Sequence, residues 1–138
     1  MKLEDFEVGI YELPDESVKK LKKLSGKTNI TWANPPKTKW ILLFLEKHIA
    51  GCLGLALNSK RKNGRIKSIA VGEKYRGIGL YYFLLDTSFS LAKKEGMKTV
   101  DIFCNENSYP GAVKKGFELK NEITRKNGRI TRHLKKYL

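Results

Sequence analysis

The sequence predicts one mixed α/β domain, in which helices on both faces flank a mostly antiparallel sheet of six to seven strands. Three observations lead to this fold class. Short apolar and β-branched runs recur between turn residues, as the strands of a sheet do. A glycine turn opens a long amphipathic helix that ends at Gly96. The length of 138 residues suits one hydrophobic core, so we expect a single domain over residues 1–138.

The chain is expected to open with a strand and a helix. Residues 6–13 alternate apolar and polar side chains, which is typical of a strand. A helix should follow from Pro14, because acidic residues stand in its first turn and apolar residues recur at Val18 and Leu21 on one face. Residues 27–38 contain two consecutive prolines and are expected to form a loop.

The middle of the chain is expected to form three successive strands. Residues 40–46 and 49–57 are two apolar runs joined by a short turn. Gly51 and Gly54 within the second run indicate a bulge or a close approach to the backbone. Residues 65–71 should form the central strand, which leads directly into the glycine turn.

The end of the chain is expected to complete the sheet. Residues 99–104 form a short β-branched run that is typical of a buried strand. Pro110 is suited to the first turn of a short helix. Residues 118–137 alternate around Asn127 and Gly128, and Asn-Gly is the strongest signal for a two-residue hairpin.

The basic glycine turn is the stretch from which chemistry can be inferred. Gly77 and Gly79 let the backbone come close to an anion, and the helix start behind them exposes N–H groups at the positive end of the helix dipole. Arg76 can add a bidentate contact. Such a turn can bind phosphate, although many strand-to-helix turns need glycine and bind nothing. It has no Walker Lys-Ser/Thr pair, which argues against nucleotide triphosphate hydrolysis.

This turn resembles the central motif of the GNAT N-acetyltransferase superfamily. In that family an Arg/Gln-x-x-Gly-x-Gly/Ala turn holds the pyrophosphate of acetyl-CoA. The corresponding residues here are Arg76, Gly77, Ile78, Gly79, Leu80 and Tyr81. Tyr81 stands where the family has its last Gly or Ala. A shifted alignment would turn Asp86 toward the core, so the helix periodicity favours this one.

A second motif supports the resemblance. Family members end the following strand with Asn and reach a Gly-Phe pair eleven residues later, and Asn105, Gly116 and Phe117 keep this spacing. The resemblance implies a sheet that splays beside the central strand, where the pantetheine arm of the cofactor pairs with exposed backbone. From the residues alone, this part of the strand can equally be plain core. The cofactor contacts expected for acetyl-CoA are Ile69, Ala70, Val71, Arg76, Gly77, Ile78, Gly79, Leu80, Tyr81 and Asn105.

The usual catalytic acid and base of the family are absent from their positions. Ala112 stands where many members carry the Tyr that protonates the thiolate, and Arg65 stands where many carry a Glu as general base. Among the remaining candidates for the acid are Tyr109 and Tyr82. For the base they are Glu73, Glu46 and His48, of which His48 has the most suitable ordinary pKa. Our first choices are Tyr109, Glu73 and His48.

The amino-acid composition limits which binding partners and which cellular location can be expected. The 28 Lys and Arg against 14 Asp and Glu give a net charge of +14, which attracts nucleic acid, anionic surfaces or acidic substrates, although solvated faces produce the same number. Cys52 and Cys104 lie in apolar runs without metal-ligand neighbours, so we expect buried reduced thiols, no metal site and a cytoplasmic protein. No apolar run approaches the about 20 residues of a membrane helix, and no signal peptide is expected.

The expected function is transfer of an acetyl group from acetyl-CoA to an amine of a small molecule or a protein, and a homodimer is the assembly considered. Two alternatives stay open: an enzyme of the same fold that modifies tRNA or a DNA base, and a basic nucleic-acid-binding module with a decayed cofactor site. The absent Tyr and Glu favour these alternatives, whereas the intact glycine turn and Asn105 favour acetyl-CoA. Trp32 is a candidate for the acceptor pocket or for a cap on the core.

Overall fold

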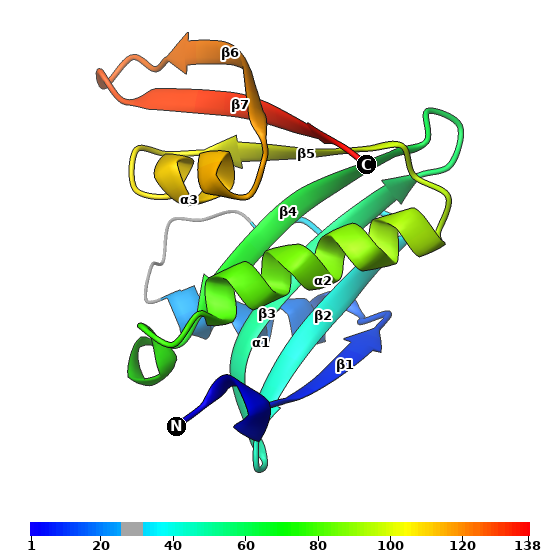
Figure 1. The fold of residues 1–138 in the computed structure, drawn as a ribbon, viewed down its shortest axis with the longest axis vertical. Coiled ribbons are helices and arrows are strands. Elements are labelled where there is room, and N and C mark those ends of the chain that lie inside the picture. Colours follow the sequence, from blue (N-terminus) through cyan, green and yellow to red (C-terminus); the bar gives the residue numbers. More distant parts are fainter. Residues whose placement is uncertain (26–31) are drawn as a thin grey trace.

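A seven-stranded sheet in the order β1-β2-β3-β4-β5-β7-β6 runs through the molecule (Figure 1). The computed structural model describes residues 1–25 and 32–138. All neighbouring strands are antiparallel except β4 and β5, which are parallel. The predicted fold class is confirmed. The strands are β1 (Glu7–Tyr11), β2 (Thr38–Leu45), β3 (His48–Asn58), β4 (Asn63–Val71), β5 (Thr99–Cys104), β6 (Glu118–Thr124) and β7 (Ile130–Tyr137), and the α-helices are α1 (Asp15–Leu21), α2 (Leu80–Lys94) and α3 (Tyr109–Lys114).

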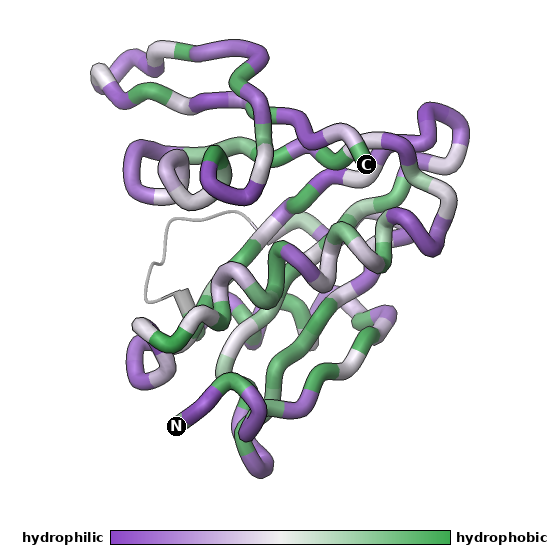
Figure 2. The backbone as a smooth tube through the Cα atoms, viewed as in Figure 1, coloured by the Kyte–Doolittle hydropathy of each residue, from purple (hydrophilic) through white to green (hydrophobic). Residues whose placement is uncertain are grey.

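Two hydrophobic cores lie on the two faces of this sheet. On one face α2 buries Leu84 and Leu85 completely, and on the other face α1 packs Val18 against Trp40 (Figure 1). Asp86 is exposed and forms an ion pair with Lys115, so the helix periodicity predicted for α2 is confirmed. Figure 2 shows hydrophobic residues in the central strands and many hydrophilic residues in the β6–β7 hairpin. Across the described residues, no helix is long and apolar enough to span a membrane.

The parallel strands β4 and β5 pair over only part of their length. The register runs from Asn63 opposite Thr99 to Ile66 opposite Ile102, and the strands then diverge (Figure 1). Residues 67–71 of β4 therefore have no strand partner on this side within the part of the chain that the structure describes. Apart from Val71 O, which accepts from Arg76 Nε, their outward backbone groups have no strand to pair with, as the resemblance implied.

Gly51 and Gly54 were predicted to mark irregularities in β3, and each lies beside a register shift. The register between β2 and β3 shifts so that Ala50, beside Gly51, has no partner. The register between β3 and β4 shifts beside Gly54 and leaves Lys67 of β4 as the unpaired residue of a bulge. Gly54 also lies under the indole of Trp40, because an added Cβ would stand 2.7 Å from the ring. The close approach is therefore made by a core side chain.

Two local details differ from the sequence prediction. Val8 and Ile10 of β1 are 48% and 47% exposed, because α2 lies over β3 and β4 and does not reach this edge strand (Figure 1). The β6–β7 hairpin closes with a three-residue loop instead of two. Arg125 N–H donates to Arg129 O and Gly128 N–H to Arg125 O, while Gly128 takes a positive φ of 80°.

The predicted loop over residues 27–38 lies partly outside the described residues, and β2 already begins at Thr38. Trp32 is half-buried and stacks on Trp40 at 6.0 Å between ring centroids. Asn34 donates from Nδ2 to Leu13 O and accepts from Trp40 Nε1, which ties the loop to the start of α1. Of the two roles considered for Trp32, the structure supports the cap on the core.

The two cysteines are buried free thiols, as expected. Burial raises the pKa of the Cys52 thiol to about 12, and burial also raises that of Cys104. Both thiols are therefore protonated near neutral pH and behave as small apolar side chains.

Substitution of Gly54 tests the contact with Trp40. Gly54→Ala should lower the free energy of unfolding by about 1–3 kcal/mol, because the new methyl group collides with the indole. Equilibrium unfolding in urea measures this difference. In a Trp40→Phe background the smaller ring leaves room, so the same substitution should cost much less. An equal cost in both backgrounds would contradict the contact.

Candidate active site

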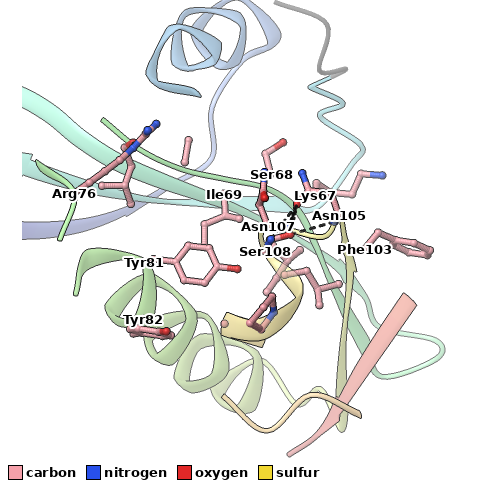
Figure 3. A pocket seen from close by; sticks show the side chains of 16 residues that line it. Lys67, Ser68, Ile69, Arg76, Tyr81, Tyr82, Phe103, Asn105, Asn107 and Ser108 are labelled. Atoms are coloured by element: carbon pink, nitrogen blue, oxygen red, sulfur yellow. Dashed lines mark hydrogen bonds between the residues drawn. The ribbon is translucent and has the colours of Figure 1, made fainter. Parts of the chain in front are cut away.

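A pocket of about 800 Å³ opens where β4 and β5 diverge (Figure 3). Its walls come from the unpaired half of β4, the end of β5, the first turn of α2 and the turn into α3. Among the predicted cofactor contacts, those that line it are Ile69, Ala70, Val71, Arg76, Tyr81 and Asn105. Other lining residues, for which the sequence predicted no role in the site, include Lys67, Ser68, Phe103, Asn107, Ser108 and Gly111.

The glycine turn borders the pocket beyond the end of β4. Gly77 and Gly79 have φ values of 86° and 88°, and a Cβ added to either would meet no atom within 4 Å. Gly79 caps α2 without a side-chain hydrogen bond, so the first N–H groups of the helix stay accessible to an anion. Arg76 Nε donates to Val71 O at 3.1 Å, which holds the guanidinium at the pocket wall (Figure 3).

The two apolar residues of the turn anchor it to the core. Leu80 is 2% exposed and Ile78 packs against the same cluster. Among the described residues, neither of these side chains lines the pocket. The cofactor contact predicted for the two residues would therefore be made by their backbone atoms. Burial of these two side chains fixes where the glycine N–H groups point.

Tyr81 extends across the pocket from the first turn of α2. Its Cε1 lies 3.2 Å from the position of a Cβ on Gly111 of α3, so a larger residue there would require the ring to shift by a few tenths of an ångström. The Tyr81 hydroxyl is buried, points into the pocket (Figure 3) and has no hydrogen-bond partner among the described residues. Burial, with smaller effects of Cys104 and Tyr82, raises its pKa to about 12. Tyr81 is thus a protonated donor that lacks an acceptor.

Ser68 provides a second unpaired hydroxyl. Its Oγ is buried and has no partner in the described part of the chain. Ser68 is opposite Gly54 in the sheet, on the face that carries Trp40, whereas Ile69 packs on the α2 side. The pocket therefore reaches both faces of the sheet through the gap between the strands.

Asn105 shapes the turn into α3. Its Oδ1 accepts hydrogen bonds from Asn107 N at 2.9 Å, Ser108 N at 3.0 Å and Ser108 Oγ at 3.2 Å, and its backbone carbonyl accepts from Tyr109 N. The side-chain carbonyl is fully occupied by this turn. Its local role is to place the start of α3 against the pocket.

Comparison with known proteins decides the family. The family model described as "Acetyltransferase (GNAT) family" matches residues 5–114. The chain belongs to the GNAT acetyltransferase family. No curated protein sequence matches it significantly.

Solved GNAT structures share the fold over nearly the whole chain. An IAA acetyltransferase from Bacillus cereus matches with a TM-score of 0.74 and 22% identity, covering 96% of this chain and 100% of that one. A Bacillus subtilis acetyltransferase in complex with CoA gives 0.75 and 17%, covering 96% and 99%. A GNAT acetyltransferase from Elizabethkingia anophelis with acetyl-CoA bound gives 0.73 and 18%, covering 97% and 99%.

The first-choice catalytic residues do not line the pocket of this GNAT chain within the described residues. Tyr109 is half-buried, with the Arg132 guanidinium 4.6 Å from its ring centroid, and Glu73 and His48 are exposed. None of the three lines the pocket within the described residues, whereas Tyr82, the other acid candidate, does. Their catalytic roles stay predictions. Residues able to hold a metal ion form no cluster in the described part of the chain.

Some of the unpredicted lining residues carried a weak signal in the sequence. Ser68 is a polar residue in an apolar strand, and Gly111 is a glycine inside a short helix. Lys67 carried no signal, because its position in the pocket results from the bulge in β4.

Removal of the Asn105 acceptor tests its part in the turn. Asn105→Ala should lower the free energy of unfolding by about 1–2 kcal/mol, because two backbone N–H groups lose their partner. Asn105→Asp keeps an acceptor oxygen and should recover most of the loss. Urea unfolding gives the values, and Asn107→Ala, in an exposed neighbour, is the control. Faster amide exchange at Ser108 should accompany the loss, and unchanged exchange would contradict the assignment.

Proposed function

We propose that this chain transfers an acetyl group from acetyl-CoA to the amine of a small molecule or a protein. The observation that carries the proposal is the open edge of β4 beside a glycine turn, both next to one pocket. No side chain caps the helix N–H groups that follow this turn. Acetyl-CoA would supply an activated acyl thioester there. The CoA and acetyl-CoA complexes of the Bacillus subtilis and Elizabethkingia anophelis proteins support this choice.

The residues present fit such a cofactor. The N–H groups at Gly77 and Gly79 and the Arg76 guanidinium would hold the pyrophosphate, because no side chain blocks the turn. The outward backbone groups of Ile69 and the Val71 N–H would bind the amide groups of an extended arm as a neighbouring strand does, whereas Val71 O already accepts from Arg76 Nε. A pocket of about 800 Å³ offers room for the reacting end of the cofactor and part of an acceptor.

For the chemistry, the structure favours Tyr81 as the hydrogen-bond donor. Its hydroxyl is inside the pocket and unpaired, whereas the Tyr109 ring packs under Arg132. A phenol with a pKa of about 12 does not give up its proton to a thiolate whose ordinary pKa is about 8.5. Tyr81 would therefore donate a hydrogen bond to the negative charge that develops as the amine nitrogen bonds to the acetyl carbon and the C–S bond breaks. The CoA thiolate would leave and take its proton from water. The amine would lose its proton through water, with exposed Glu73 or His48 as the proposed bases.

Nucleic acid is the second candidate for the acetyl acceptor, and the net charge of +14 favours it. Steeply salt-dependent RNA or DNA binding, together with acceptor-dependent CoA release, would select it over a small amine. Nucleic-acid binding without affinity for CoA would instead indicate a binding module.

Gly79→Asp tests the cofactor site. The new carboxylate faces the proposed pyrophosphate position, so acetyl-CoA affinity should fall by roughly 100-fold or more through like-charge repulsion. Gly79→Asn is the matched control, because Asn tolerates the same left-handed backbone without the charge. Calorimetric titration with acetyl-CoA gives both values. Normal affinity in the Asp variant would refute the placement of the pyrophosphate.

Tyr81→Phe tests the donor. The ring keeps its packing on Gly111, but the hydroxyl is gone, so kcat should fall by roughly 100-fold while the Kd for acetyl-CoA changes little. The assay follows acceptor-dependent CoA release from a panel of amines.

Tyr82→Phe and Tyr109→Phe are the matched controls, and each should retain near-normal turnover. If only Tyr109→Phe lost turnover, the hydrogen-bond donor would be Tyr109 and not Tyr81.

A further inference from the structure

We propose that Arg65 and Lys67 form an anion-binding acceptor site at the mouth of the pocket on the sheet face away from α2. The acceptor would then be an amine that also carries a carboxylate or a phosphate. This inference rests on the proposed acetyl transfer and names its substrate class.

The side chains of this site share one face of the sheet. Ile66 and Ile102 are buried in the core under α2, so their neighbours along each strand, Arg65 and Phe103, point to the opposite face. The Arg65 guanidinium lies 4.5 Å from the centroid of the Phe103 ring. His133 of β7 stacks on the same ring at 4.7 Å. Phe103 thus fixes a cation at the edge of the gap between β4 and β5, and its own ring lines the pocket.

Lys67 brings a second positive charge into the pocket itself. It is the bulged residue of β4, half-buried, and it lines the pocket. Burial lowers its pKa, and the nearby charge of Arg65 lowers it further. Two cations that destabilise one another in this way are stabilised by an anion between them. Ser68, next in the chain, adds an unpaired hydroxyl to the same wall.

No acidic residue neutralises this pair within the described part of the chain. Residues 26–31, which are not described, contain no Asp or Glu in the sequence. Asp101 lies opposite Arg65 in the register, and its carboxylate already lies 3.3 Å from His133 Nε2 and 3.8 Å from Lys135 Nζ. The mouth therefore keeps an excess of positive charge.

This anion site is separate from the glycine turn. Val71 lies four positions beyond Lys67 along the extended strand, a span of about 13 Å, and the turn lies beyond Val71. The proposed cofactor enters from the α2 side, where Tyr81 and Gly111 stand. An acceptor must then approach through the other mouth, past Arg65 and Lys67. A cation pair at that mouth would hold an anionic group of the acceptor while its amine reaches the gap.

The test is an NMR titration of the isotope-labelled protein, saturated with CoA, with sodium phosphate and separately with sodium acetate at constant ionic strength. Saturable shifts are expected at Arg65, Lys67 and Phe103. In the double variant Arg65→Met/Lys67→Met the phosphate Kd should rise at least about tenfold, because both charged donors are lost. The Met side chains keep the apolar stems in place. The stronger of the two anions indicates which acceptor chemistry applies.

Lys94→Met removes a charge at the exposed C-terminal end of α2 and is the matched control for general electrostatics. It should leave the phosphate Kd unchanged. The proposal is overturned if no saturable shift occurs at these residues, or if the double variant keeps the affinity of the native chain. It is also overturned if shifts spread evenly over the basic surface, or if RNA alone competes for the site.

A second arm separates this inference from the proposed function. The same titration of the Gly79→Asp variant without CoA still reports on Arg65 and Lys67, so loss of cofactor binding does not hide the result. If acetyl transfer occurs, O-phosphoethanolamine should have a lower KM than ethanolamine, or glycine a lower KM than glycinamide. The double variant should abolish that preference, and a preference that survives it would refute the assigned residues.

Discussion

The site depends on the divergence of β4 from β5. The two strands pair from Asn63 to Ile66 and then separate, while β4 stays paired with β3 and β5 with β7. Backbone N–H and C=O groups along residues 67–71 lose their partners on one side, and such groups need a replacement partner when they are covered. An extended ligand with its own amide groups meets that need. The bulge at Lys67 falls at the point of separation and turns a charged side chain toward the gap.

The side chains of the first turn of α2 and of α3 are complementary in size. Tyr81 occupies a position that is Gly or Ala in the family motif, and Gly111 of α3 gives its ring room. Ala112, where many relatives carry a Tyr, is completely buried. The phenols that line the pocket, Tyr81 and Tyr82, come from α2. The raised pKa of Tyr81 suits it to donate a hydrogen bond, because the proton stays on the oxygen at neutral pH.

Charge is organised locally as well as globally. A net charge of +14 raises the concentration of any anion around the molecule, and it does so without choosing a site. Selection requires cations that lack acidic partners and that border a cavity. Lys39, Lys115 and Arg132 are each paired with a carboxylate, whereas Arg65 stacks on Phe103 and Lys67 lines the pocket.

The sequence by itself determined the features that depend on near neighbours in the chain. The positive φ at Gly77 and Gly79, the buried stripe at Leu84 and Leu85, and the positive φ at Gly96 just after α2 follow from residue type and spacing. For this reason the strands, the helices and the glycine turn were predicted, and six of the ten expected cofactor contacts line the pocket.

The tertiary structure decided which polar atoms are left without partners. The unpaired hydroxyls of Ser68 and Tyr81 depend on how elements that are far apart in the sequence pack around the pocket. Gly54 signals an irregularity in β3, but the register between β3 and β4 decides that Lys67 is the bulged residue of β4 and so lines the pocket. Long-range pairing and packing select these details, because the same short run of residues is compatible with several registers.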